Sequence, residues 1–367
     1  MTTMKKHVAV ALSGGLDSAV AAALLRNKSH QVMGLHFRTG YEALPGGVDS
    51  SGQLSRLDSQ AERVASQIGI PFEVVDCSQA FESEVVRYFV DSYRSGQTPN
   101  PCMVCNQRIK FGLMLEIARA RGASTLATGH YARIRREEDA RLSLIKGVDD
   151  GKDQSYFLAL LNQEQLGRAS FPLGAYTKKQ VKDMAGSFGL TSFREGESQE
   201  LCFVGERNYK EFLSKHAVFP GKPGEIVNTA GDVLGHHNGL HAFTIGQRRG
   251  INTPGPAPYY VLRLDQEQNR LVIGSKSELA ATECLVRQIN WIGIEPPGKP
   301  LSVRTRIRYR HTEAESILTP LNGHAAKVLF SRPQYAITPG QAAVFYRGER
   351  VLGGGWIVPN TSPMRNG

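Results

Sequence analysis

The sequence has few cysteines, no long apolar run and no tract of low complexity. Its five cysteines in 367 residues are too few, and odd in number, for a disulfide framework, which indicates a reducing compartment, and we expect the cytoplasm. No apolar stretch approaches the roughly 18–20 residues that a membrane-spanning helix needs, and the short apolar run near the N-terminus lacks the features of a secretory signal. The G-x-x-x-x-G-K-[ST] pattern is also missing, which excludes a Walker-type ATPase.

Positive charge, by contrast, is in excess. Lys and Arg number 44 against 34 Asp and Glu, a formal net charge of +10, which favours a polyanionic partner. Residues 301–350 alone hold eight Lys or Arg against three Glu, and four of these arginines alternate with other residues, so that a strand would place them on one face. This pattern predicts a surface for a nucleic-acid backbone, although a solvated sheet face has the same composition. The four are Arg304, Arg306, Arg308 and Arg310, and candidates to extend the surface are Arg133, Arg135, Arg136, Arg248 and Arg249.

The first part of the chain alternates between strand-like and helix-like patterns. Short apolar runs, each followed by helical periodicity, predict a Rossmann-like α/β domain with a parallel sheet covered on both faces. These runs are His7–Leu12, Gln31–Phe37, Phe72–Asp76 and Thr125–Thr128. Pro and Gly separate short segments beyond about residue 205, and alternating runs from about residue 280 are typical of a small antiparallel β-barrel. We therefore predict an α/β domain over residues 1–204, a small central domain over 205–278 and a C-terminal barrel over 279–367.

The motif with the strongest chemical signal is SGGLDS, residues Ser13 to Ser18, which follows the first predicted strand. Its two glycines permit a tight turn whose N–H groups point at an anion, and the helix that follows adds its positive N-terminal end. The hydroxyls of Ser13 and Ser18 add donors, whereas Asp17 suits a magnesium ion that bridges phosphate oxygens. The motif predicts a phosphate-binding loop at the carboxyl end of a parallel strand, where ligands of such sheets bind.

A second group of reactive residues lies in Thr98–Asn106, which reads TPNPCMVCN. Its prolines predict an irregular loop between helices, and the nearby charges of Arg108 and Lys110 are expected to lower the pKa of Cys105. The C-x-x-C spacing leaves three interpretations open: part of a structural zinc site, a redox pair, or a nucleophilic or persulfide cysteine with a partner elsewhere. Cys202 in SQELCFV is a candidate partner. The remaining two cysteines are interpreted as small buried apolar side chains: Cys77 and Cys284.

Six segments occur in the order that is typical of one enzyme family. They are PNPCMVCNQRIKF, TGHYAR, KDQSYFL, SQELCFV, GQRRG and RIRYR. The SGGLDS loop in turn resembles the pyrophosphate loop of ATP pyrophosphatases, and from residue 7 to about residue 358 the chain is similar to tRNA-specific 2-thiouridylases. That family installs sulfur at C2 of the wobble uridine of certain tRNAs. The resemblance implies an N-terminal PP-loop catalytic domain and a C-terminal β-barrel that binds tRNA.

The resemblance also implies roles for individual residues. Cys105 matches the family's nucleophile, and Cys202 matches the cysteine that carries a persulfide and forms a transient disulfide with Cys105. The positions that match ATP contacts are Ala11, Leu12, Ser13, Gly14, Gly15, Leu16, Asp17, Ser18, Phe37 and Gly129. The positions that match contacts with tRNA or its target base are Asn100, Pro101, Cys102, Lys152, Asp153, Gln154, Arg308 and Tyr309. Some members have Asp at the position of Cys102, so this thiol is not expected to be indispensable.

The implied reaction uses ATP and Mg²⁺, with tRNA as the substrate. ATP adenylates the uridine O2 and pyrophosphate leaves; the Cys202 persulfide, charged by a cysteine desulfurase or a sulfur-relay protein, then delivers sulfur to C2, giving 2-thiouridine and AMP. Because Cys105 and Cys202 lie far apart in sequence, residues Gly196–Gly205 are predicted to move when tRNA binds. An iron–sulfur cluster on Cys102, Cys105 and Cys202 is an open alternative.

Two other classes of protein share single features with the chain. A small-molecule ATP pyrophosphatase would account for the SGGLDS loop but would leave the basic C-terminal region without a role. A non-catalytic RNA-binding module would account for the charge, but not for the loop and the cysteines. Release of pyrophosphate that depends on tRNA would separate all three classes.

Overall fold

A computed structural model describes residues 6–41, 56–193, 201–204, 209–216 and 222–359. The chain forms two compact units. The first comprises Met1–Val85, Cys102–Gly205 and Gly348–Leu352, and the second comprises Val86–Pro101, Glu206–Arg347 and Gly353–Gly367. The two units are not consecutive in sequence, because residues 86–101 belong to the second unit. The predicted domain limits at residues 204 and 278 stay predictions.

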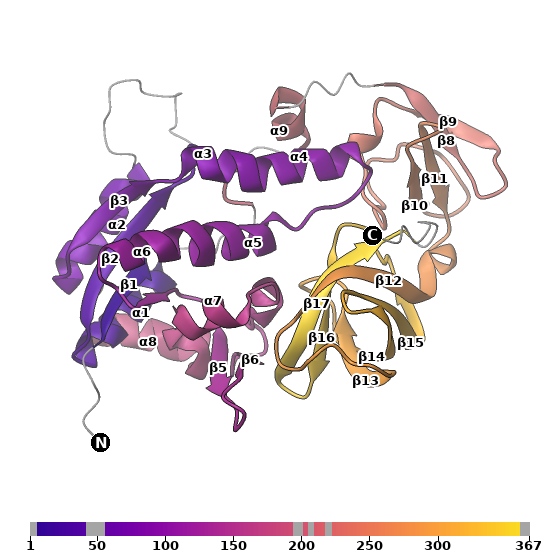
Figure 1. The fold of residues 1–367 in the computed structure, drawn as a ribbon. Coiled ribbons are helices and arrows are strands. Elements are labelled where there is room, and N and C mark those ends of the chain that lie inside the picture. The colour runs from indigo at the N-terminus through magenta and orange to yellow at the C-terminus, as the bar shows by residue number, and fades with distance from the viewer. Residues whose placement is uncertain (1–5, 42–55, 194–200, 205–208, 217–221, 360–367) are drawn as a thin grey trace. The chain divides into compact units, whose positions relative to one another are not determined.

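The first unit is built on a five-stranded parallel sheet with the order β3-β2-β1-β4-β7 (Figure 1). Its strands are β1 (His7–Ala11), β2 (Gln31–Arg38), β3 (Phe72–Asp76), β4 (Thr125–Ala127) and β7 (Ala169–Ser170). Val8, Ala9 and Val10 are all buried, as expected for a strand covered on both faces. This sheet confirms the predicted Rossmann-like fold.

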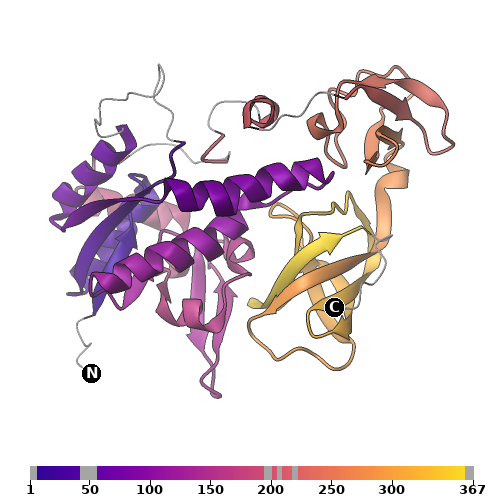
Figure 2. The same cartoon turned by 45° about the horizontal axis from the view of Figure 1, so that its top comes forward.

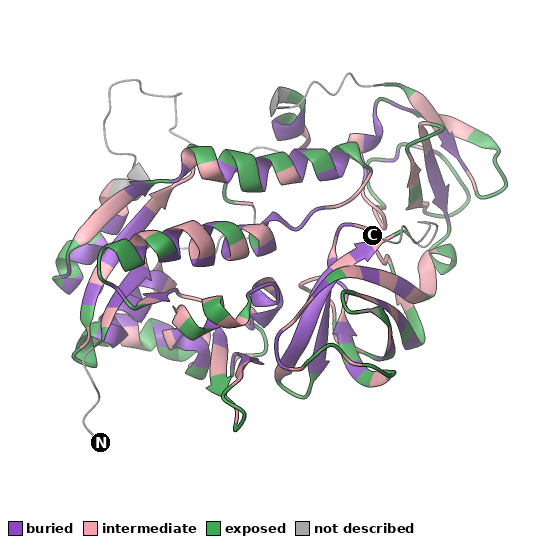
Figure 3. Cartoon of the chain, in the orientation of Figure 1, coloured by how far each residue is buried: buried purple, intermediate pink, exposed green. Residues whose placement is uncertain are grey.

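The helices of the first unit include α1 (Leu16–Asn27), α2 (Arg56–Ile68), α3 (Ser78–Phe81), α6 (Leu115–Ala120), α7 (Gln163–Arg168) and α8 (Lys178–Ser187). Of these, α1, α2, α6 and α7 contact the sheet, and α8 packs against α1. In α1 every residue from Ser18 to Leu25 is buried (Figure 3). The small alanines of this helix let β1, β2, α2 and α8 approach it from several sides. The unit also contains the hairpin β5 (Ala132–Arg136) and β6 (Leu142–Lys146), and the 3₁₀ segments η3 (Ser155–Leu158) and η4 (Pro172–Ala175).

The segment that carries Cys102 and Cys105 is helical, so the predicted irregular loop over Thr98–Asn106 is wrong from Pro101 onward. α5 (Pro101–Val104), the π-helical segment η2 (Cys105–Met114) and α6 follow one another without a break. Proline is well suited to a first helical position, because its fixed φ matches the helix and it lacks an N–H that would have no partner there. The π-helical segment η1 (Glu82–Val86) similarly joins α3 to α4 (Arg87–Arg94).

The second unit contains α4, a central four-stranded sheet and a closed six-stranded antiparallel barrel (Figure 2). The central sheet has the order β10-β11-β8-β9, with β8 (Gly224–Val227), β9 (Val233–His237), β10 (Tyr260–Asp265) and β11 (Arg270–Gly274). The barrel strands are β12 (Ala280–Trp291), β13 (Leu301–Arg306), β14 (Ala314–Asn322), β15 (Ala325–Tyr335), β16 (Ala342–Arg347) and β17 (Arg350–Val358). The short helices are α9 (Tyr209–His216), η5 (Leu240–Ala242) and η6 (Ser277–Leu279). The predicted C-terminal β-barrel is confirmed.

Cys77 and Cys284 are both buried, which confirms their interpretation as small core side chains. Burial raises the pKa of Cys77 to about 11 and that of Cys284 to about 12, so both are protonated near neutral pH.

Candidate functional site

The SGGLDS loop joins the end of β1 to the start of α1. Gly14 has a φ of +73°, a left-handed conformation that glycine adopts without strain, and a Cβ added there would lie 3.2 Å from Gln60 Cγ. Gly15 is the N-cap of α1 and provides no side-chain capping bond. The loop therefore presents a glycine turn and a helix N-terminus capped by no side chain, which is the geometry that receives a phosphate.

The two serines of the loop differ in role. Ser18 is buried; its Oγ donates to Gly15 O (3.0 Å) and accepts from Ser13 N (3.2 Å), so it stabilises the turn. Ser13 is exposed, and its Oγ lies 3.2 Å from Ser18 Oγ. Of the two predicted hydroxyl donors, Ser13 is the one positioned to meet a ligand.

Asp17 is bound by two residues that the sequence analysis did not single out. Lys178 Nζ lies 2.7 Å from Asp17 Oδ1 and 2.8 Å from Oδ2, and the Tyr131 hydroxyl donates to Oδ1 at 2.8 Å. The side chain of Lys178 is 14% exposed and that of Asp17 is 34% exposed. A capping box of Thr177 and Gln180 starts α8 at Lys178, a pattern readable in the sequence, but nothing in the pattern says that α8 begins against the loop.

Gly129, at the end of the neighbouring strand β4, closes the loop from a second side. A Cβ at this position would lie 2.9 Å from the carbonyl carbon of Asp17 and 3.0 Å from Ser18 N. The backbone of β4 therefore approaches the loop at a distance that only glycine allows. Phe37 lies half-buried near the end of β2, at the same edge of the sheet, and its contact with ATP stays a prediction.

The cysteines form the second part of the site. Cys105 begins η2 and is 8% exposed, whereas Cys102 in α5 and Cys202 are exposed. Burial raises the pKa of Cys105 to about 12; Lys110 opposes this shift, and negative charge on Cys202, Cys102 or Cys77 adds to it. Although part of Cys102 is exposed, surrounding protein atoms desolvate its thiol. This desolvation, and then negative charge on Cys202, raises the pKa of Cys102 to about 11. These thiols are thus close enough to affect one another's ionisation.

The expected lowering of the Cys105 pKa is therefore wrong for this conformation. The charge of Lys110 does act in the predicted direction, but desolvation of the buried thiol is larger. Arg108 is exposed and lies 4.0 Å from Glu84. Near neutral pH Cys105 is a thiol, and its activation needs a change in its surroundings.

Alkylation tests this state directly. Cys105 should react with iodoacetamide roughly a thousandfold more slowly than an ordinary thiol near neutral pH, because its pKa of about 12 leaves little thiolate, and the rate should rise about tenfold per pH unit. Lys110→Met should slow the reaction further, and Lys110→Arg should restore it. The readout is peptide mass spectrometry, with exposed Cys202 as the internal reference. Equal labelling of Cys105 and Cys202 near neutral pH would contradict this picture.

His130, in the TGHY motif, is a neutral side chain at the end of β4. Burial, and then the charge of Lys110, holds its pKa well below its usual value. Its Nδ1 lies 2.7 Å from the Thr128 hydroxyl, which fixes the ring. The positive charge of Lys110 thus lowers the pKa of His130 and also those of Cys102 and Cys105.

Phe203 anchors the turn that carries Cys202. Its buried ring lies edge-on to Phe81 (centroids 5.7 Å apart) and to Tyr41 (6.1 Å apart), and the Tyr41 hydroxyl donates to Glu82. The aromatic contact holds residues 201–204 while the neighbouring Cys202 stays exposed. Residues 196–200 and 205 of the predicted moving segment lie outside the described residues.

Replacing Phe203 by Ala should therefore misplace Cys202. We expect formation of the Cys105–Cys202 disulfide under mild oxidation to slow by about tenfold, because the loss of aromatic contact removes about 3 kcal/mol or more of packing. Phe243→Ala removes a similarly buried ring from the central part of the second unit and serves as the matched control. An unchanged rate with Phe203→Ala would exclude the anchoring role.

The predicted target-base segment is held within the second unit by residues that the sequence analysis missed. Gln341 Nε2 donates to Thr98 O and to Pro99 O, both at 3.1 Å, and Asn100 N donates to the Tyr88 hydroxyl at 3.3 Å. Asn100 itself is buried. These contacts order the backbone just before α5, and no local sequence pattern links Gln341 to residues so distant.

Asp153 supports its own loop. The side chain is 2% exposed and accepts bonds from Gly147 N (3.1 Å), Ser155 N (3.1 Å) and Ser155 Oγ (3.0 Å). Gln154 Oε1 similarly accepts from Tyr131 N at 3.0 Å. The contact of Lys152, Asp153 and Gln154 with tRNA stays a prediction. Because the Asp153 side chain is buried and bonded within its own loop, Asp153 could contact tRNA in this conformation only through its backbone.

The predicted row of four arginines along one strand is wrong in part. β13 ends at Arg306, whose side chain is 15% exposed, lies 3.4 Å from Glu313 and packs over the Tyr346 ring. Arg308 lies beyond the strand and donates to Tyr335 O at 3.1 Å. Arg306 is therefore part of the barrel's internal structure. Arg304 and Arg310 are exposed, and the roles of Arg308 and the half-buried Tyr309 toward tRNA stay predictions.

Two other arginines of the predicted surface are paired with acids. Arg133 lies 3.1 Å from Glu349, and Arg135 lies 3.0 Å from Glu137. Arg135 is nonetheless exposed. Three further arginines of the predicted surface are exposed, namely Arg136, Arg248 and Arg249, although Arg136 also donates to Ala140 O.

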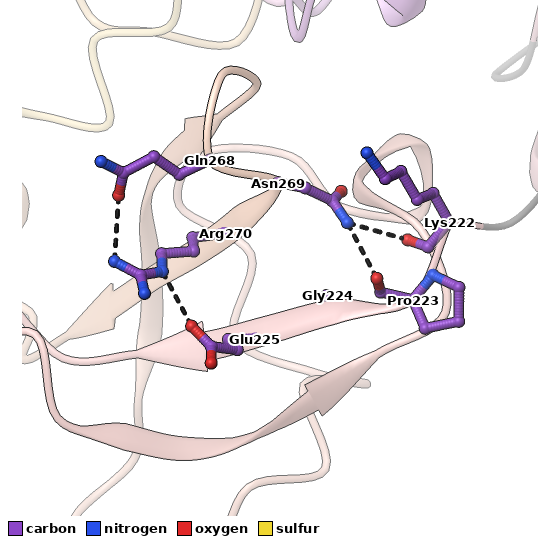
Figure 4. Close-up of a pocket in the computed structure, with 7 residues that line it drawn as sticks. All are labelled: Lys222, Pro223, Gly224, Glu225, Gln268, Asn269 and Arg270. Carbon is purple, nitrogen blue, oxygen red and sulfur yellow. Dashed lines mark hydrogen bonds and ion pairs between the residues drawn. The ribbon is translucent and has the colours of Figure 1, made fainter.

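A shallow pocket of about 370 Å³ lies in the central sheet (Figure 4). It is lined by Lys222, Pro223, Gly224, Glu225, Gln268, Asn269 and Arg270. Its polar groups bond to one another: Arg270 donates to Glu225 (2.8 Å) and Gln268 (3.0 Å), and Asn269 donates to the carbonyls of Lys222 and Pro223. These bonds join β8 to β11, so we assign the pocket a structural role.

Neither a group of metal ligands nor a membrane-spanning helix is present among the residues that the structure describes. Among those residues, no three His, Cys, Asp or Glu side chains are grouped so as to hold a metal ion. Three histidines lie close together in sequence, His236, His237 and His241, and His237 has a structural role. Its Nδ1 accepts from Gly239 N at 3.0 Å and its Nε2 lies 3.2 Å from Asn269 O. No helix in the described part of the chain is long and apolar enough to cross a membrane.

Comparison with known proteins agrees with this architecture. Three family models match in order: the tRNA methyl transferase HUP domain over residues 6–206, the tRNA methyl transferase PRC-barrel domain over 210–275 and the Aminomethyltransferase beta-barrel domain over 281–357. A protein named tRNA-specific 2-thiouridylase MnmA from Geobacter metallireducens is 46% identical over 96% of this chain and 97% of its own. Proteins of the same name are 46% identical in Desulfosudis oleivorans (95% and 94% covered) and 44% identical in Syntrophotalea carbinolica (98% and 100% covered).

The parallel HUP-type sheet with its glycine-rich loop, joined to a PRC-barrel domain and a closed β-barrel, defines a multidomain enzyme of the HUP-domain class. Within that class, the chain belongs to the family of tRNA-specific 2-thiouridylases, which are sulfurtransferases.

Proposed function

We propose that the protein thiolates the wobble uridine of tRNA in two steps, adenylation of the uridine O2 by ATP and sulfur transfer from a persulfide on Cys202. The observation that carries this proposal is that one compact unit holds both the SGGLDS loop and two cysteines far apart in sequence, Cys105 and Cys202, of which Cys202 is near enough for its charge to contribute to the raised pKa of Cys105. Family membership supports tRNA as the substrate.

The residues of the loop fit the phosphates of ATP. The glycine turn at Gly14, the N-terminus of α1 and the close approach of Gly129 leave a cradle that a Cβ would fill. In the first step the uridine O2 attacks the α-phosphorus of ATP, the bond to the β-phosphate oxygen breaks, and pyrophosphate leaves into the loop, whose N–H groups stabilise its charge. Asp17 is the residue that would hold a magnesium ion, which would offset charge on the phosphate oxygens.

Sulfur transfer follows at the activated C2. The terminal sulfur of the Cys202 persulfide attacks C2 and forms the C–S bond. The Cys105 thiolate then attacks Cys202 Sγ, so that the S–S bond breaks, its electron pair stays on the sulfur at C2, and AMP leaves with the former O2. The product is 2-thiouridine with a Cys105–Cys202 disulfide, which a thiol reductant returns to two thiols. A cysteine desulfurase or sulfur-relay protein supplies each new persulfide sulfur, and the exposure of Cys202 supports such delivery.

The raised pKa of Cys105 supports an order of events. While Cys105 is protonated it does not attack the persulfide, so the persulfide is protected until tRNA binding changes the surroundings of the thiol. For an iron–sulfur cluster on Cys102, Cys105 and Cys202, the described residues offer no group of three metal ligands, and we derive no step through one.

The experiment is incubation of the pure protein with ATP, magnesium, unmodified tRNA and a persulfide donor, followed by mass spectrometry of the digested RNA and measurement of pyrophosphate. We expect 2-thiouridine, with pyrophosphate release that depends on tRNA. Pyrophosphate release without tRNA would favour a small-molecule synthetase, and binding of tRNA with neither product would favour a non-catalytic RNA-binding protein.

A further inference from the structure

The ion pair between Asp17 and Lys178 places a negative charge inside a loop that is shaped for an anion. The carboxylate of Asp17 lies in the first turn of α1, next to the N–H groups that would bind phosphate. Alone it would repel that phosphate. In the structure both of its oxygens are within 2.8 Å of Lys178 Nζ, so the charge is compensated.

The backbone of Lys178 is fixed independently of this ion pair. Lys178 is the first residue of α8, its N–H donates to Asp149 Oδ2 at 2.9 Å, and the preceding Thr177 and Gln180 form a complete capping box. Its ammonium group also lies 5.8 Å from the centre of the Tyr131 ring. A flexible four-carbon side chain on a fixed backbone can therefore move its charge by a few ångströms without moving the helix.

We propose that Lys178 is a pyrophosphate-binding residue of the ATP site, and that its ammonium group stays paired with Asp17 until the nucleotide binds. On binding, the ammonium group exchanges the Asp17 carboxylate for the departing phosphate oxygens, and Asp17 becomes available to a cation. The partly buried position of Lys178 favours this role, since a cation with little water around it interacts strongly with a multiply charged anion. This inference rests on the proposed use of ATP.

The alternative is a purely structural ion pair that keeps the loop in shape. The two roles differ in what the removal of Asp17 does. If Lys178 only neutralises Asp17, loss of either partner disturbs the loop, and loss of both does no further harm. If Lys178 binds pyrophosphate, loss of Asp17 frees the ammonium group and removes a repelling charge, so that pyrophosphate binds more tightly.

The test is calorimetric titration of the full chain with pyrophosphate, and separately with ATP, in the presence of EDTA. We expect Lys178→Met to weaken pyrophosphate binding at least tenfold and Asp17→Asn to strengthen it. The double variant should bind more tightly than Lys178→Met, because the unpaired Asp17 charge is gone, but less tightly than Asp17→Asn. Lys179→Met is the matched control, because this neighbouring lysine of α8 is exposed, and it should bind as the wild type does. Lys178→Arg should recover part of the affinity.

Three results would overturn the inference: wild-type affinity in Lys178→Met, equal weakening by Asp17→Asn and Lys178→Met, or no pyrophosphate binding by the wild type. Thermal unfolding of each variant without ligand separates lost binding from lost folding. The proposed function is judged independently, by whether the wild type makes 2-thiouridine from tRNA. If the wild type makes 2-thiouridine and Lys178→Met binds pyrophosphate as tightly as the wild type, this inference is rejected while the proposed function stands.

Discussion

Replacing Cys202 by Ser is expected to reduce 2-thiouridine formation from a persulfide donor by at least about a thousandfold, as the loss of a covalent carrier does in other enzymes. Because Cys202 is exposed, the substitution should leave the fold and the thermal unfolding temperature unchanged. Pyrophosphate release in the presence of tRNA should continue, since adenylation precedes sulfur transfer. The two products are measured in one reaction, by mass spectrometry and by a pyrophosphate assay.

The sulfur source and the loading of the persulfide distinguish the two cysteines. With free sulfide in place of the persulfide donor, both Cys202→Ser and Cys105→Ser should recover activity, because sulfide attacks C2 with no S–S bond to break. With the persulfide donor both variants should be inactive, but Cys105→Ser should still load the persulfide, whereas Cys202→Ser should not. Cys284→Ala, which removes a buried barrel thiol, is the matched control and should retain activity. Full activity of Cys202→Ser with the persulfide donor would remove Cys202 from the reaction.

The second large effect is expected from Gly14→Ala. The φ of +73° costs an L-residue about 1–2 kcal/mol, and the added Cβ would lie 3.2 Å from Gln60 Cγ and 3.3 Å from Ala61 N, so the turn must shift. Because the N–H groups of the turn are the proposed phosphate ligands, we expect ATP affinity to fall by about a hundredfold and thiolation to fall with it. Calorimetry with ATP and the thiolation assay measure the two effects.

Gly186→Ala provides the matched control for this substitution. Gly186 is an exposed residue of α8 with nothing within 4 Å of an added Cβ, so alanine should stabilise the helix by about 0.5–1 kcal/mol and leave ATP binding unchanged. Wild-type ATP affinity in Gly14→Ala would show that the loop does not hold the phosphates through its turn.

The parallel sheet was predictable because its strands are short apolar runs followed by helical periods, and both faces of β1 are buried. The helix at Pro101 was not. A proline within a polar segment equally suits an irregular loop or a first helical position, and the choice depends on the packing of the residues that follow.

The chemistry of the site depended on contacts that no local pattern contains. Asp17 suggested a cation, yet its partner in the structure is Lys178, which a separate capping box brings to the loop. The charge of Lys110 suggested an acidic Cys105, but burial, which depends on tertiary packing, outweighs it. Arg306 likewise follows the alternation of a surface strand, but Glu313, beyond a turn, holds it within the barrel.

The most direct measurement follows one sulfur atom. Cys202 is loaded with a persulfide whose terminal sulfur carries a heavy isotope, excess donor is removed, and the protein is mixed with ATP, magnesium and unmodified tRNA for a single turnover. The account predicts that the label appears in 2-thiouridine, in an amount no greater than the persulfide loaded, together with a Cys105–Cys202 disulfide. Label that remains on the protein, or leaves as sulfide while unlabelled sulfur enters the tRNA, would contradict it.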